Sequence, residues 1–193
     1  MVPDLPAIVR ALAGAARLAR FDPDGLMYFD DDARAVVQSF FAAVLVAPGY
    51  AILVVQHLGR VDVTAGPLSA GLVEFFGYVI SWTAFPVAVL ELSRLMERGE
   101  RWFGFVVALN WSKVLQMALY LPAALLAGAA AGESGPGAAS LLTFLALMAI
   151  LAYQWFVTRS ALNITGVQAA GLTGIDVVLG LMITGLTDGA ISG

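Results

Sequence analysis

The stretch FGFVVALNWSKVLQMALYLPAALL, residues Phe103–Leu126, contains the most informative pattern in this chain. Nearly all of it is apolar, yet its middle, NWSKVLQ at residues 110–116, is polar and holds the only lysine of the sequence. About 20 predominantly apolar residues are enough for a helix to cross the hydrocarbon core of a bilayer. The stretch therefore predicts a transmembrane helix with polar side chains at mid-depth.

The composition extends this interpretation to the whole chain. Of its 193 residues, 60% are hydrophobic and 12% are charged, with a mean hydropathy of +0.87. Soluble domains contain about a quarter charged residues. Because apolar runs alternate with short charged or Gly/Pro-rich breaks, we predict an all-α fold, a polytopic transmembrane helical bundle in one domain. The absence of cysteine excludes disulfides and thiolate metal sites, and the single histidine, His57, excludes a multi-histidine site within one chain.

Five apolar runs predict five spans, which together make a transmembrane domain over residues 35–193. They cover about 36–55, 68–90, 103–130, 139–157 and 167–186. Pro48-Gly49 predicts a kink within the first span. His57 and Arg60 fall in the short loop that we expect after it.

Residues 1–34 are expected to precede the spans as an amphipathic helix over Pro3–Arg20 and an acidic, aromatic linker. One face of the helix is apolar and the adjacent face is basic: Leu5, Ile8, Val9, Leu12 and Ala16 against Arg10, Arg17 and Arg20. Such a helix can lie in the headgroup layer or pack on the end of the bundle. Asp31 or Asp32 is expected to cap the helix that follows.

The distribution of basic residues predicts the orientation. With five spans, eight arginines fall on the side of the N-terminus, namely Arg10, Arg17, Arg20, Arg34, Arg94, Arg98, Arg101 and Arg159, and only Arg60 falls on the other. Cytoplasmic loops are enriched in Lys and Arg. We therefore expect a cytoplasmic N-terminus and an outside C-terminus. The richness in alanine, glycine and arginine is typical of a GC-rich bacterial genome and predicts a bacterial cytoplasmic membrane.

Three ionisable residues lie well inside the predicted spans: Glu74, Lys113 and Asp176. A charge at mid-bilayer costs about 2.5–3.5 kcal/mol even on the lenient insertion scale, so such residues normally face protein or water. Counting along the helices places Lys113 and Asp176 at similar depth. We predict an ion pair between them, with Glu74 as an alternative partner. Three roles remain open for these residues: a structural pair, a transport or proton-relay role, and a partner-facing role.

The intramembrane charges share their helix faces with other polar residues. Asn110 and Gln116 are expected on the face of Lys113, and Thr173 on the face of Asp176. Sequence motifs for nucleotide, nucleophilic or zinc-dependent chemistry are absent. We therefore predict no enzyme activity, no cofactor and no metal site. The membrane location and dispersed arginines argue against nucleic acid.

Five spans, the predicted orientation, the length and short Gly/aromatic stretches such as Phe75-Phe76-Gly77-Tyr78 resemble the Yip1-like membrane protein family, including its bacterial members. The resemblance covers the whole chain at the level of topology. The DLYGP-type sequence of the eukaryotic family is absent, so no functional residue is carried over. The resemblance implies a non-enzymatic role in organising membrane components.

Two functions are consistent with these patterns. The first is a non-catalytic scaffold or accessory subunit, which has the lipid bilayer and other membrane proteins or further copies of itself as partners. It predicts an apolar patch of protein size and no continuous water path. The second is a small ion- or proton-coupled transporter or channel that uses Lys113, Asp176 and Glu74. It predicts a cavity, open to one side, that reaches those residues.

Overall fold

The computed structural model describes residues 2–130 and 137–192 and is helical throughout these ranges, with no strand among them. The elements in chain order are α1 (Leu5–Leu18), η1 (Pro23–Tyr28), α2 (Ala33–Ser39), α3 (Phe41–Leu58), α4 (Pro67–Leu95), η2 (Gly99–Arg101), α5 (Trp102–Ala130), α6 (Gly137–Leu162) and α7 (Gly166–Ser192). Five helical segments within the described ranges are long and apolar enough to cross a membrane, and α2 with α3 forms the first. The predicted fold class, an all-α transmembrane bundle, is confirmed.

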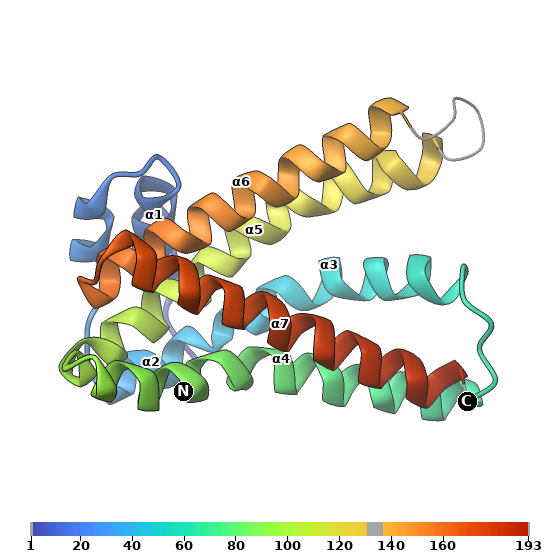
Figure 1. Ribbon diagram of the computed structural model, residues 1–193, viewed down its shortest axis with the longest axis horizontal. Helices are drawn as coiled ribbons and strands as arrows, with labels where there is room; N and C mark the ends of the chain where they lie inside the picture. Colours follow the sequence, from blue (N-terminus) through green and yellow to red (C-terminus); the bar gives the residue numbers. More distant parts are fainter. Residues whose placement is uncertain (1, 131–136, 193) are drawn as a thin grey trace.

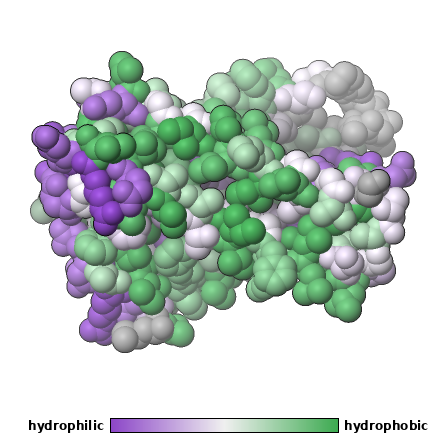
Figure 2. All heavy atoms as spheres, turned by 60° about the horizontal axis from the view of Figure 1, so that its bottom comes forward, coloured by the Kyte–Doolittle hydropathy of each residue, from purple (hydrophilic) through white to green (hydrophobic). Residues whose placement is uncertain are grey.

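The long helices form two pairs, α5 with α6 and α4 with α7, which diverge toward one end of the bundle, with α3 between them (Figure 1). The end that holds α1, η1, η2 and the α6–α7 connection is called the arginine-rich end. The opposite end, with the C-terminus and residues 59–66, is called the C-terminal end. Figure 2 shows hydrophilic residues gathered over the arginine-rich end and hydrophobic residues over the middle of that face.

Apolar side chains account for both the interior and much of the outer surface. The most deeply buried ones lie on α4, α5 and α6, including Phe85, Phe105, Leu109 and Val157. Many others face outward, such as Phe76 at 58% exposure. An apolar exterior of this extent would be a liability in water. It suits helices whose outer faces contact lipid.

Helix α1 packs on the end of the bundle, against η1 and α5. Its buried face consists of Ala11, Gly14, Ala15 and Leu18, whereas Leu5 and Val9 of the predicted apolar face are 72% and 58% exposed. The buried face is therefore made of small residues, because η1 approaches closely. A Cβ at Gly14 would lie 2.7 Å from Tyr28 Cβ. Of the two expected placements, packing on the bundle is the one observed.

An ion pair outside the spans fastens η1 to α1. Arg17 Nε donates to Asp22 Oδ2 at 2.7 Å, and Asp22 Oδ1 accepts from the backbone N–H of Asp24. Hydrogen bonding to Arg17 holds the pKa of the Asp22 carboxyl below its ordinary value. The acidic linker is therefore attached to α1 by charge as well as by packing.

The first span begins as predicted but is interrupted elsewhere. Asp32 caps α2 by accepting from Ala35 N at 2.7 Å, so the expected aspartate cap is confirmed. The helix breaks at Phe40, between α2 and α3, whereas Pro48 lies inside the uninterrupted α3. The Ser39 hydroxyl donates to Val36 O at 2.7 Å. Serine bonding of this kind competes with the helix backbone. It does not by itself explain the break, because Ser81 makes the same bond to Tyr78 O inside the uninterrupted α4.

The C-terminal end is closed by backbone hydrogen bonds between distant parts of the chain. The N–H groups of Thr64 and Ala65 both donate to Ile191 O, at 3.0 and 3.1 Å. Ile191 is itself fully buried. The segment that joins α3 to α4 is therefore fixed to the last turn of α7.

Candidate functional site

A cavity of about 450 Å³ lies at the C-terminal end, between α3, α4, α5, α6 and α7. Its polar lining includes Tyr50, His57, Arg60, Glu74, Tyr120 and Asp188. Small-molecule sites commonly have volumes of about 300–1,000 Å³ and a few convergent polar groups. The cavity is therefore the candidate site in the described part of the chain.

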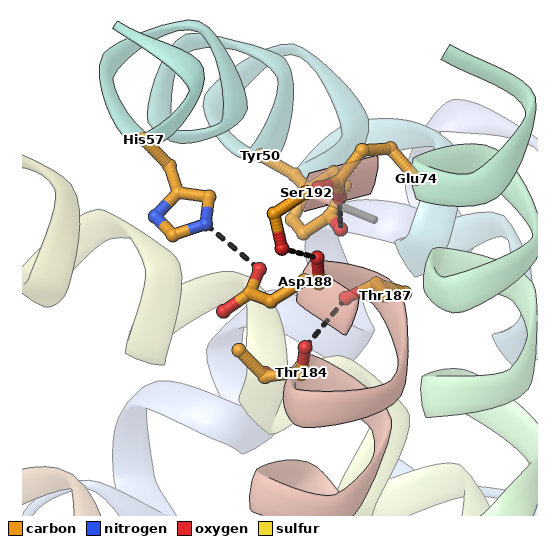
Figure 3. Close-up of polar contacts among 7 residues, drawn as sticks. All are labelled: Tyr50, His57, Glu74, Thr184, Thr187, Asp188 and Ser192. Carbon is orange, nitrogen blue, oxygen red and sulfur yellow. Dashed lines mark hydrogen bonds and ion pairs between the residues drawn. The ribbon is translucent and has the colours of Figure 1, made fainter. Parts of the chain in front are cut away.

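Glu74 is the deepest charged residue of the cavity. At a rise of about 1.5 Å per residue, it lies about 10 Å from the start of α4 at Pro67. Its side chain is buried, with a residue exposure of 8%, and its Oε2 accepts from the Tyr50 hydroxyl at 2.8 Å (Figure 3). The Tyr50 ring packs against the Tyr78 ring at a centroid distance of 4.5 Å. Two aromatic residues therefore hold α3 against α4 beside the carboxylate.

A second polar contact joins α3 to α7 nearer the helix ends. His57 Nε2 lies 2.9 Å from Asp188 Oδ1, and both side chains are more than one third exposed (Figure 3). The Ser192 hydroxyl donates to the backbone carbonyl of Asp188. The contact places an imidazole and a carboxylate on the same wall of the cavity.

The third charged element of the lining is Arg60, which lies with Gln56 against α5. A Cβ at Gly128 would be 2.7 Å from Arg60 Nη2 and 2.6 Å from Gln56 Nε2. The ends of both flexible side chains therefore lie directly over Gly128, and a larger residue there would displace them. Among the described residues, neither Arg60 nor Glu74 has an oppositely charged group within 4.0 Å.

The predicted ion pair between Lys113 and Asp176 is wrong: within the described ranges these residues make no contact within 4.0 Å. Lys113 Nζ instead donates to Ser81 O at 3.4 Å and lies 4.8 Å from the centroid of the Trp82 ring. The physical reason is the packing order: α6 lies between α5 and α7 and contacts both.

Amide side chains link α5 and α6 to Asp176 on α7. Gln116 Nε2 donates to Gln154 Oε1 at 2.9 Å, and Gln154 Nε2 donates to Asp176 Oδ2 at 3.3 Å. Lys113 and Asp176 still interact electrostatically. Three of the predicted residues, Lys113, Gln116 and Asp176, therefore belong to one region of the interior, although they are not paired directly.

The remaining predicted residues take no part in these hydrogen bonds. Asn110 is fully buried and its Nδ2 donates to Ser39 Oγ at 2.9 Å, which joins α5 to the end of α2. Thr173 on α7 is buried, and its hydroxyl has no hydrogen-bond partner within the described structure. Glu74 lies in the cavity. Of the six predicted residues, Lys113, Gln116 and Asp176 thus share one interior region, whereas Asn110 and Glu74 lie in two other places.

Sequence reasoning missed most of the cavity. His57 was expected in a loop, but it lies on the last turn of α3. Asp188 was not singled out because the apolar run ends near residue 186, whereas α7 continues to Ser192. An ionisable residue two positions beyond each predicted apolar run would have been the signal for both. In the part of the chain that the structure describes, no three His, Asp or Glu residues are grouped as metal ligands.

Comparison with known proteins returned no match: no family model, no curated protein and no solved structure matches this chain.

Proposed function

We propose that the protein is a non-enzymatic integral membrane protein that associates with other membrane components and receives one of them in the C-terminal cavity. The observation that supports this proposal is a cavity of about 450 Å³ among helices of membrane-spanning length, with charged and hydrogen-bonding side chains on a largely apolar lining. No described segment of the chain fills it. Charged groups at this depth are costly when they face lipid. A polar part of another component is suited to cover them.

The arrangement of side chains favours binding over catalysis. Nucleophilic catalysis requires a nucleophile within hydrogen-bond reach of a base that is itself oriented by a third group. His57 is oriented by Asp188, but the nearby Ser192 hydroxyl donates to the Asp188 backbone carbonyl instead of the imidazole. Among the described residues, the cavity is therefore lined by hydrogen-bonding groups without an activated nucleophile, which suits binding.

The orientation is part of the proposal. Arginine-containing segments gather at one end of the bundle, so the positive-inside rule places that end in the cytoplasm and the cavity on the outer side. The proposal also includes that the membrane is a bacterial cytoplasmic membrane and that the chain is related to the Yip1-like family. The chain has no cysteine, so single cysteines at Glu97 and Ser192 give a direct test. Labelling of both from the same side of the membrane would refute this threading.

The binding role is tested by filling the cavity. Ala127 lines it, whereas Ala129 on the same helix is exposed and is not part of the lining. The protein is extracted with its surrounding lipid in polymer nanodiscs, and associated lipids and proteins are identified by mass spectrometry. We expect Ala127→Trp to lose a component that the natural chain and Ala129→Trp both retain. Identical components in all three samples would contradict the proposal.

A second candidate is a small ion- or proton-coupled carrier or channel. It is favoured by the interior polar groups of Gln116, Gln154 and Asp176 near Lys113. The cavity lining includes Glu74 but neither Lys113 nor Asp176, so this route is interrupted. Proton uptake into liposomes that contain the purified protein, abolished by Glu74→Gln, would reverse the order of the two candidates.

A further inference from the structure

The C-terminal cavity contains one carboxylate and one guanidinium without an ion-pair partner in the described structure. Glu74 accepts only from a neutral tyrosine, and Arg60 has no carboxylate within 4.0 Å, while His57 and Asp188 contact each other. We propose that the ligand of this cavity is a zwitterion with an ammonium group and a phosphate group. This inference rests on the proposed function, in which the cavity receives another component.

The ammonium end belongs at Glu74. A buried charge without an opposite charge is strongly unfavourable, and a single hydroxyl donor compensates a carboxylate only in part. An ammonium group brings a full positive charge and three donors into the same space. Tyr50 and Tyr120 line the cavity near this position, and tyrosine rings attract cations at their faces. Charge and aromatic lining thus favour the same group.

The phosphate end belongs at Arg60. Its guanidinium offers a planar fork of donors that matches phosphate oxygens, and it lies beside the Gln56 amide over Gly128. Phosphate has enough acceptor oxygens to bond both side chains. Gly128 leaves these two side chains on the helix surface, where a ligand in the cavity can reach them.

Neither charge alone engages both groups of the lining. Arg60 is exposed and can be solvated without a ligand, so a simple cation would leave its donors unused, whereas a simple anion would leave the buried Glu74 uncompensated and would also approach Asp188. Ammonium and phosphate occur together in free phosphoethanolamine and in the headgroup of phosphatidylethanolamine. The cavity suits the ammonium and phosphate groups that both molecules share, and reconstitution distinguishes the free compound from the lipid headgroup.

The test compares the whole ligand with its halves. The full chain is purified in mild detergent, and its thermal unfolding is followed with phosphoethanolamine, ethanolamine or inorganic phosphate. Binding to the folded state raises the melting temperature, with a stabilisation that grows as the logarithm of the ligand concentration divided by Kd. We expect phosphoethanolamine to bind at least tenfold more tightly than either half. The proposal would be overturned if ethanolamine alone or phosphate alone raised the melting temperature as much as phosphoethanolamine does. It would also be overturned if none of the three compounds raised the melting temperature and phosphatidylethanolamine had no effect either.

Substitutions at Glu74 and Arg60 test which residue binds the ammonium group and which binds the phosphate group. Glu74→Gln and Arg60→Gln are each expected to weaken binding about ten- to hundredfold, because each removes a charge-assisted hydrogen bond. Asp62→Asn is the matched control, since Asp62 is an exposed acid near the same end that does not line the cavity. Ala127→Trp, which retains both charges, should also abolish binding. Unchanged affinity in all three cavity variants would overturn the proposal.

Reconstitution identifies the source. If nanodiscs with phosphatidylethanolamine stabilise the protein over nanodiscs with phosphatidylglycerol alone, and free phosphoethanolamine adds nothing, the ligand is the lipid headgroup. If only free phosphoethanolamine protects, the ligand is soluble. No protection from either, while Ala127→Trp still loses a co-purified component, would refute the zwitterion and leave the binding role of the cavity standing. If neither ligand protects the protein and Ala127→Trp loses no co-purified component, both the zwitterion and the binding role of the cavity are refuted.

Discussion

Replacing Gly77 by alanine would place a methyl carbon 2.6 Å from Thr187 Cγ2, where α4 packs on α7. Thr187 cannot rotate freely to relieve the overlap, because its hydroxyl donates to Thr184 O at 2.9 Å. Overpacking of this kind typically costs about 1–3 kcal/mol. The same substitution at Gly71, also on α4, meets nothing within 4 Å and serves as the matched control.

The two alanine variants separate packing from helix propensity. Both gain the preference of alanine over glycine, about 1 kcal/mol in a helix interior. Gly77→Ala should therefore be less stable than Gly71→Ala by about 1–3 kcal/mol, which corresponds to a difference of about 2–12 °C in melting temperature for a chain of this size. Unfolding in mild detergent can be followed by the fluorescence of the four tryptophans.

A second substitution tests the identity of the clash. Thr187→Ser removes Cγ2 and keeps the hydroxyl, so it should restore most of the stability that Gly77→Ala loses, with a coupling energy of about 1–3 kcal/mol in the double-mutant cycle. Equal stability of Gly77→Ala and Gly71→Ala would refute the close approach of α4 to α7. Failure of Thr187→Ser to rescue would show that another atom is responsible.

Three further predictions concern other contacts. Ser39→Ala should cost about 1–3 kcal/mol in unfolding free energy, because it leaves the buried Asn110 amide without its acceptor; an unchanged value would contradict that bond. Arg17 lowers the pKa of Asp22, so the ion pair that attaches η1 to α1 is fully formed above the ordinary carboxyl pKa and weakens as the pH falls below about 4. Amide hydrogen exchange of residues 19–28 should become faster over that pH range. Asp22→Asn should remove the pH dependence. Lys113→Met should leave the unfolding free energy unchanged or higher, because a buried cation without a direct carboxylate partner contributes little stability; a loss above about 3 kcal/mol would indicate a true pair.

The spans could be predicted because the cost of placing charge in lipid separates apolar runs from their connections. The same cost identified Glu74 as a site residue, and the structure places it on the cavity wall. Its partner Tyr50 gave no signal, because a tyrosine in an apolar run is compatible with many environments. The break at Phe40 also gave no signal, because no proline or glycine marks it in the sequence.

The error at Lys113 and Asp176 shows what depth arithmetic lacks. Counting residues along two helices gives the height of each charge but not which helices are neighbours. Here α6 lies between α5 and α7, and Gln154 of α6 is the side chain that bonds Asp176, while Lys113 bonds Ser81 O on α4. Pairing across a bundle therefore needs the packing order, which hydropathy does not contain.

The hydrogen bonds from Thr64 and Ala65 to Ile191 also bear on how the protein is made. Synthesis proceeds from the N-terminus, so the α3–α4 connection is made well before the Ile191 carbonyl that fixes it. Asp188 lies one turn earlier in α7, so His57 also acquires its carboxylate partner late. A nascent chain in which α7 has not yet been made lacks one wall of the cavity, so the binding site is completed only after the first four described spans have been synthesised.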